Sequence, residues 1–142
     1  MPSFSSVQAG LRANGPLVQL SIAVPQAVED ALIAAGNPVP APVTVGSIID
    51  TGASTTVVRT GLCRSLGLNP VGVIMIHTPS SANVPCEQFS VRLAFPNNVQ
   101  GTAIVTEAPM PGQGIDALIG RDVLSQAVLV YIGFANTFSL SF

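Results

Sequence analysis

The sequence predicts a single all-β domain over residues 1–142, and three observations support that prediction. Runs of β-branched and apolar residues with the length of strands recur along the chain. Glycine, proline and asparagine separate these runs, as turn residues do. A unit of strand, tight turn, polar cluster and short helix also occurs twice. A chain of 142 residues is long enough for one modest core of its own.

The first forty residues predict a strand and a short helix. Residues 1–15 are small and polar and are expected to form a loose N-terminal arm. Leu17–Val24 partly alternates and predicts the first strand. Gln26–Gly36 has the apolar spacing of a short helix that ends at its glycine. Pro38 and Pro40 then favour an extended link into the next strand.

The most informative stretch is Ser47–Val58, where an apolar run ends in a carboxylate. Asp50 follows the run directly, and an ionised acid at the end of a buried strand is costly unless it has a partner or a function. Gly52 allows a close approach of the backbone, so its N–H can reach the carboxylate. The alternative is an ordinary strand-ending aspartate in an Asx turn, since Asp-Thr-Gly is also turn composition.

A second short helix and a long hairpin are predicted next. Thr60 is a candidate N-cap, and Gly67 is a candidate C-terminal stop. Leu62, Cys63 and Leu66 form the inner face between them. The following expectations are a strand at Val71–Ile76, a polar turn at His77–Pro85, a strand at Glu87–Phe95, a turn at Pro96–Asn98, a strand at Gly101–Val105 and a loop at Pro109–Gly114.

An internal repeat organises the second half of the chain. Ile48–Gly52 matches Leu118–Asp122 at an offset of 120 − 50 = 70 residues. Gly120 stands where the first copy has Asp50, so the second copy keeps the local fold without the acid. Two final strands are expected at Val128–Tyr131 and Phe138–Phe142, the latter with its apolar face against the sheet.

Composition excludes several classes of partner. Charged residues make up only 8% of the chain, the net charge is −2 and lysine is absent, which argues against nucleic acid and anionic membranes. So few charges indicate that some apolar surface is buried against another chain. No apolar run is long enough to span a bilayer and no secretory signal is visible, so we expect a soluble, cytoplasmic protein.

Other catalytic and metal chemistries fit the sequence poorly. There is no Gly-x-Ser-x-Gly motif and no phosphate-binding glycine loop. Cys63 and His77 could serve a cysteine protease, but Cys63 falls on a predicted helix face. One histidine with Cys63 and Cys86 is a poor zinc set, and these cysteines are expected to be buried reduced thiols. We therefore expect no cofactor and no metal.

Two motifs carry a family resemblance. Ile48–Ser54 resembles the active-site signature of aspartic proteases. Ala117–Leu124 resembles the second signature of the single-domain, retroviral-type members, the retropepsins. The resemblance spans Val43–Phe142 and makes residues 25–41 an insertion. It implies a retropepsin-like acid protease fold: a closed, barrel-like lobe with one or two short helices and a flap hairpin, working as a homodimer.

The resemblance also assigns roles to residues. Asp50 is the catalytic acid, and Thr51, Gly52 and Ala53 form the active-site loop, with Thr51 bonding across a two-fold axis. Gly120, Arg121 and Asp122 form a structural brace. The flap and substrate-binding residues are Ile76, His77, Thr78, Pro79, Ser80 and Ser81.

Two of these assignments depart from the family pattern. Family members often carry an acid a few residues after Asp-Thr-Gly that pairs with the arginine, but the corresponding positions here are Ser54 and Thr55. Arg121 is therefore expected either to reach Asp122, Asp116 or the partner chain, or to form a weaker brace. The flap also lacks glycines.

The resulting functional hypothesis is an aspartic endopeptidase. Two carboxylates sharing one proton activate a water and protonate the scissile carbonyl. Asp50 is the only such acid in the chain, so a two-fold homodimer would supply the second. Extended peptides with apolar side chains are the expected substrates. The alternative is a catalytically weak dimerisation or peptide-binding module with the same fold.

Overall fold

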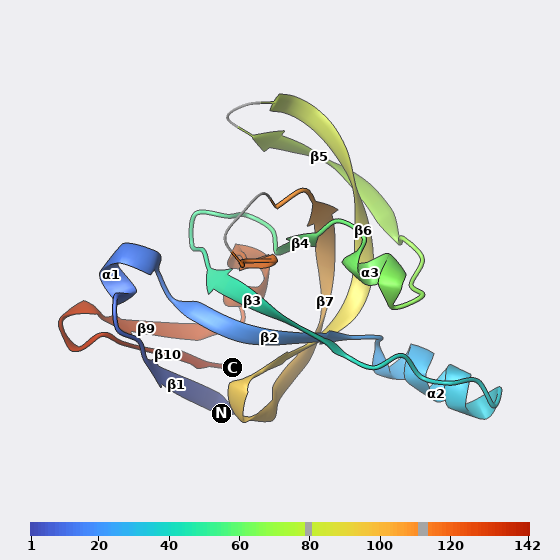
Figure 1. Cartoon of the computed structure of the whole chain (residues 1–142), viewed down its shortest axis with the longest axis horizontal. Helices are drawn as coiled ribbons and strands as arrows, with labels where there is room; N and C mark the ends of the chain where they lie inside the picture. Colours follow the sequence, from blue (N-terminus) through green and yellow to red (C-terminus); the bar gives the residue numbers. More distant parts are fainter. Residues whose placement is uncertain (79–80, 111–113) are drawn as a thin grey trace.

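The computed structural model describes residues 1–78, 81–110 and 114–142 and is mostly β-structure (Figure 1). The strands are β1 (Ser3–Val7), β2 (Leu17–Ala23), β3 (Val43–Ile49), β4 (Val57–Arg59), β5 (Gly72–Thr78), β6 (Ser81–Phe95), β7 (Val99–Ala108), β8 (Ala117–Ile119), β9 (Val128–Ile132) and β10 (Thr137–Ser141). The helices are α1 (Leu11–Asn14), α2 (Gln26–Ala34), α3 (Leu62–Ser65) and α4 (Arg121–Leu124), with 3-10 turns η1 (Pro96–Asn98) and η2 (Gly133–Ala135). The predicted all-β class is confirmed.

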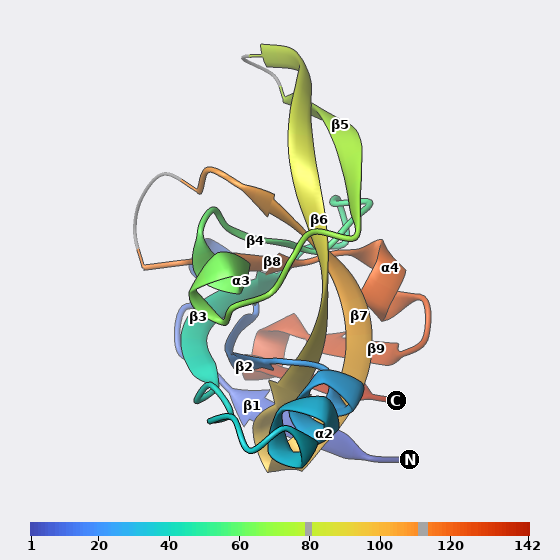
Figure 2. The same cartoon turned by 90° about the vertical axis from the view of Figure 1, so that its right-hand side faces the viewer.

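The larger sheet closes into a barrel. Its strand order is β2-β3-β8-β4-β7-β6-β5, and a further pairing of β2 with β6 joins the ends of the first six strands. Strand β5 pairs only with β6 in the described part of the chain, so the β5–β6 hairpin extends beyond the barrel. Both views show this hairpin rising above the rest of the molecule (Figures 1 and 2).

The internal repeat predicted from the sequence is built into the barrel as a pair of parallel neighbours. Strand β3 pairs with β8 in the register Ser47↔Ala117, which is 117 − 47 = 70 residues. Strand β4 then pairs with the other side of β8. Because β3 and β8 run in parallel, the turns that follow them lie at the same end of the barrel.

The N-terminal segment corrects the prediction of a loose arm. Strand β1 pairs with β10 in the register Ser3↔Ser141, and β10 pairs with β9 to form a second, three-stranded sheet. Phe4 and Leu11 are buried in the core. The small and polar composition of 1–15 concealed this, because only two apolar side chains hold the segment in place.

Three further boundaries differ from the predictions. Strand β6 begins at Ser81, so the polar turn predicted for His77–Pro85 is mostly strand. Helix α3 is capped by Gly61, whose φ is 89°, and not by Thr60. Strand β7 extends past the predicted Gly101–Val105 to Ala108. In each case strand pairing or backbone geometry outweighed local polarity.

The core lies inside the barrel and between the two sheets. Inner-face residues of α3 and alternate residues of β10 are buried as predicted. Helix α2 projects from the side of the barrel (Figure 1). Arg92 of β6 connects to it through an ion pair of 2.7 Å with Glu29. Cys63 and Cys86 are free and buried, as expected.

Candidate active site

Asp50 lies in the turn that follows β3, at the open end of the barrel. Ile49 before it is buried, whereas Asp50 itself is only partly buried. Its backbone N–H donates to the Ile119 carbonyl of the neighbouring copy at 2.9 Å. The Gly52 N–H donates to Asp50 Oδ1, also at 2.9 Å. A Cβ on Gly52 would lie 3.1 Å from that oxygen, so glycine permits the close approach predicted from the sequence.

The second copy supports this turn through its own polar residues. The Arg121 N–H donates to the Ala53 carbonyl, and Arg121 Nη1 donates to the Thr51 carbonyl, both at 2.9 Å. The brace predicted for Arg121 therefore ends on a backbone oxygen of the Asp50 loop. Asp116 pairs instead with Arg59 at 3.2 Å, so it is not the partner of Arg121.

Asp122 and Thr56 connect the two copies of the internal repeat through several hydrogen bonds. Asp122 Oδ2 accepts from the Thr56 N–H at 2.9 Å, and Oδ1 accepts from the Thr56 hydroxyl at 2.7 Å. The same hydroxyl oxygen accepts from the Gly120 N–H at 3.0 Å. Asp122 is thus committed to Thr56 and not to Arg121. Sequence reasoning missed Thr56, because nothing in the sequence distinguishes it from the neighbouring polar residues Ser54 and Thr55.

Gly120 lies where the Asp50 loop passes over the end of β8. A Cβ at this position would fall 2.5 Å from both C and O of Thr55 and 3.0 Å from the Thr56 nitrogen. Its φ of −91° is an ordinary extended value, so the requirement for glycine is one of space and not of backbone conformation. No side chain, acidic or otherwise, fits here.

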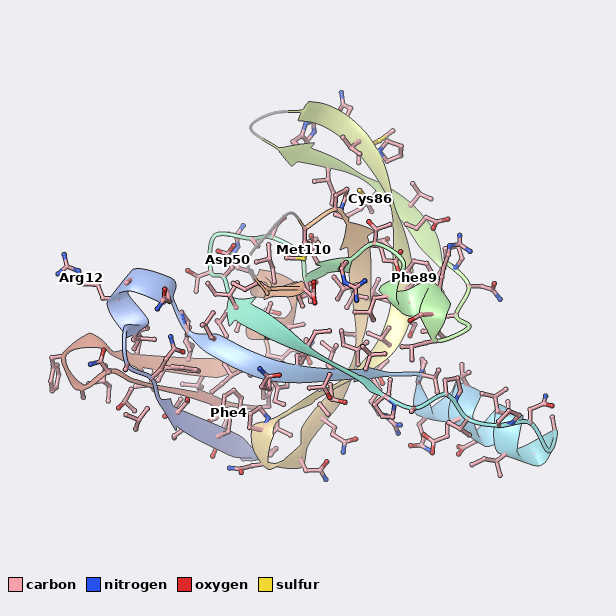
Figure 3. All side chains as sticks on the ribbon, viewed as in Figure 1. Phe4, Arg12, Asp50, Cys86, Phe89 and Met110 are labelled. Atoms are coloured by element: carbon pink, nitrogen blue, oxygen red, sulfur yellow. The ribbon has the colours of Figure 1, made fainter. Side chains whose placement is uncertain are left out.

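The β5–β6 hairpin covers the end of the barrel that carries Asp50 (Figure 3). Ile76 is partly buried and His77 is exposed on β5. Thr78 and Ser81 pair across the hairpin, whereas Pro79 and Ser80 lie outside the described residues. Asn83, with φ 57°, adopts the left-handed conformation for which glycine is usually used. The segment His77–Pro85, which contains no glycine, thus obtains part of its backbone geometry from asparagine.

Two sulfur-containing side chains lie in the same region. Figure 3 places Met110, from the segment after β7, between Asp50 and Cys86 of β6. Met110 is partly buried and Cys86 is buried. The sequence analysis selected Cys86 only as a buried thiol and did not select Met110.

A buried glutamate anchors the segment after β4. Glu107 of β7 is 6% exposed and accepts from the Gly61 N–H at 2.9 Å and the Cys63 N–H at 2.7 Å, at the start of α3. Burial, together with the charge of Glu107 and its hydrogen bond, raises the pKa of the Cys63 thiol to about 12. Cys63 is therefore a structural thiol and not a nucleophile.

Comparisons with known proteins identify the fold. No protein-family model matches the sequence, and no curated protein sequence matches it either. A retropepsin-like aspartic protease from Rickettsia conorii superposes with a TM-score of 0.52 at 12% identity, over 98% of this chain and 89% of that one. A foamy viral protease-reverse transcriptase, solved with an RNA/DNA hybrid, gives 0.51 at 16% identity over 82% of this chain. The match spans 13% of the foamy viral chain.

The chain therefore has a retropepsin-like fold, and the resemblance drawn from its two motifs is confirmed at the level of structure. The Asp50 turn, the Gly120 turn and the hairpin are the parts of that fold that define the candidate site. No helix in residues 1–78, 81–110 or 114–142 is long and apolar enough to cross a membrane.

Proposed function

We propose that this protein is an aspartic endopeptidase that acts as a homodimer, with Asp50 of each chain forming the catalytic pair. The observation that carries the proposal is the position of Asp50. It is a partly buried carboxylate held by the Gly52 N–H in a turn that a second copy of the same unit supports. Hydrogen bonds that fix the position of a partly exposed carboxylate favour a chemical role for it over a structural one.

The second carboxylate has to come from another molecule. Within the chain, the equivalent turn carries Gly120, where no side chain fits. A two-fold axis beside the Asp50 turn would bring the two Asp50 side chains together. Two carboxylates about 3 Å apart cannot both ionise, so they share one proton. The ionised one would remove a proton from a water, and the protonated one would donate to the scissile carbonyl oxygen.

An extended peptide substrate would bind between the hairpin and the Asp50 loop. The free edges of β5 and the hairpin offer backbone groups for strand-like pairing with a substrate. Met110, which lies near Asp50 in the view of Figure 3, would offer apolar, polarisable surface to such a peptide. Peptides with apolar residues on either side of the scissile bond are the expected substrates.

The proposal can be tested by incubating the protein with a peptide library at mildly acid pH and measuring cleavage. The test variant is Asp50→Asn. Asparagine retains an oxygen that can accept the Gly52 N–H, so the variant is expected to fold normally. It cannot act as a base, and cleavage should fall by about 10³-fold or more. A matched control is Asp30→Asn, which removes an acid from the exposed face of α2 and should leave the rate unchanged.

The outcomes separate the enzyme from its rival. Cleavage that is lost in Asp50→Asn but retained in Asp30→Asn supports the protease. Peptide binding without cleavage in all three proteins supports the alternative, a catalytically weak binding module with this fold. Cleavage that survives in Asp50→Asn contradicts the assignment of Asp50.

A further inference from the structure

Strand β7 has one edge that is paired over only part of its length. Strand β4 pairs with the last three residues of β7, whereas β6 pairs along its other edge. The Thr106 N–H donates to the Thr56 carbonyl on the β4 side. Because backbone groups alternate between the two edges of a strand, those of Gln100, Thr102 and Ile104 point to that side too. In the described part of the chain, no other strand or loop pairs with them.

This free edge borders a cleft of about 490 Å³. Residues 100–104 line one side, and α4 lines the other, where Figure 2 shows it beside the lower part of β7. The apolar lining comes from Leu93, Phe95, Val99, Val123 and Phe142. We call the space between residues 100–104, α4 and these side chains the β7 cleft. Its volume lies in the range of about 300–1,000 Å³ that is typical of ligand sites.

The chemistry of the edge indicates what the β7 cleft binds. Proteins usually protect a free strand edge with a charge, a proline or a bulge. Residues 100–104 carry neither charge nor proline, and their pairing with β6 is regular. A row of unpaired backbone N–H and C=O groups beside apolar side chains fits an extended peptide. Such a peptide would bond to the edge through its backbone and place alternate side chains in the cleft.

Charge in the β7 cleft favours a peptide with a basic residue. Asp122 is the only charged residue among the described residues that line it, and it forms no ion pair with them. Oδ1 of Asp122 accepts from the Thr56 hydroxyl and the Val123 N–H, whereas Oδ2 accepts only from the Thr56 N–H in that part of the chain. A carboxylate oxygen can accept two hydrogen bonds, so Oδ2 has capacity for an arginine or lysine of the peptide.

Asp122 also connects the β7 cleft to the candidate active site, because it holds Thr56 at the end of the Asp50 loop. A polypeptide bound at Asp50 brings its own remote segments close to the cleft, at a high effective concentration. We propose that the β7 cleft binds an extended segment of the polypeptide substrate, away from the scissile bond. The segment adds to β7 as a strand and places a basic residue at Asp122. This inference rests on the proposed function for the source of the segment.

Peptide binding can be measured without cleavage in the Asp50→Asn protein. The probe is a fluorescent peptide of about seven residues that alternates valine and threonine and ends in arginine. Thr102→Pro removes an N–H that has no partner in the described chain, and an edge position tolerates proline. The Kd of the probe, from fluorescence anisotropy, should rise about tenfold or more. Thr102→Val keeps the N–H and should leave the Kd unchanged.

A second variant protects the test against misfolding of Thr102→Pro, which thermal melts would reveal. A Cβ at Gly101 would meet nothing within 4 Å, so Gly101→Ile can fill part of the β7 cleft without strain. It should also weaken binding of the probe. Replacing the arginine of the probe by glutamate should raise its Kd about tenfold. A probe that does not bind, or that binds equally to every variant, overturns the proposal.

Cleavage kinetics separate this inference from the proposed function. The probe sequence is joined to a short peptide that the wild-type protein cleaves. Thr102→Pro should raise KM for this longer substrate about tenfold and leave KM for the short peptide unchanged. Equal kinetics of Thr102→Pro and wild type on both substrates support the protease and overturn the β7 cleft. Probe binding that Thr102→Pro weakens, in a wild-type protein that cleaves no peptide, supports the β7 cleft as a peptide site and contradicts the protease.

Discussion

The turns after β3 and β8 start from parallel neighbouring strands, yet only the first ends in an acid. At Asp50 the carboxylate accepts from the Gly52 N–H while remaining partly exposed. At Gly120 the chain lies against the backbone of Thr55 and Thr56 and leaves no room for a side chain. The strand pairing is common to both turns, so the difference arises after the strand ends.

Because of that difference, the two copies of the internal repeat have different roles. The first copy presents a carboxylate, and its loop carries carbonyl oxygens that need donors. The second copy supplies those donors from Arg121, and its Asp122 holds Thr56 by two hydrogen bonds. Because the two turns interlock, an acid at position 120 would displace the loop that holds Asp50. The comparison explains why a duplicated unit in this chain yields one candidate catalytic acid and not two.

The largest effect is expected from filling the space at Gly120. In Gly120→Ala the added methyl group would lie 2.5 Å from the Thr55 carbonyl, so the backbone has to move. We expect a loss of about 3 kcal/mol in the free energy of unfolding, measured by urea denaturation. Gly101→Ala is the control, because nothing lies within 4 Å of a Cβ there. Equal stability of the two variants would contradict the interlocked turns.

A smaller loss is expected from removing the hydroxyl that joins the copies. Thr56→Val leaves the Gly120 N–H without a partner and removes one of the two donors to Asp122 Oδ1, which keeps the Val123 N–H, at a cost of roughly 2 kcal/mol. Thr106→Val is a matched control, because Thr106 is equally buried and its hydroxyl has no partner among the described residues. That substitution should be neutral or stabilising in the same urea measurement. A similar loss in both variants would mean that burial, and not the hydrogen bonds, sets the cost.

The sequence predicted the strands and the Asp50 turn because their signals are local. Alternation marked β10, and the 70-residue offset between the motifs reappears as the register of β3 with β8. The Gly52 N–H was expected on Asp50 because an Asp-x-Gly turn brings the two groups together. These features depend on residues a few positions apart, or on a repeat that can be read directly.

The features that were missed depend on pairing between distant segments. Phe4 and Leu11 are held by β10 and the core, which nothing in residues 1–15 announces. Glu107 reaches Gly61 across 46 positions, and Arg121 reaches Thr51 across 70. The sequence suggested three hydrogen-bond partners for Arg121, namely two aspartates and the partner chain. In the structure its side chain donates to a backbone carbonyl. A main-chain acceptor has no residue type, so composition could not point to it.

The smallest effect on stability is expected at Arg121. Arg121→Gln removes an exposed donor to the Thr51 carbonyl, and the free energy of unfolding should fall by less than about 1 kcal/mol. If the donor positions the Asp50 loop, kcat should drop about tenfold while KM changes little, because the loop meets the reacting atoms and not the rest of the peptide. Arg12→Gln on α1 is the control for the lost charge. An equal fall in kcat in both variants would mean that the net charge of the protein sets the effect. An unchanged kcat in Arg121→Gln would show that the second copy of the repeat supports the fold of the Asp50 loop and not its chemistry.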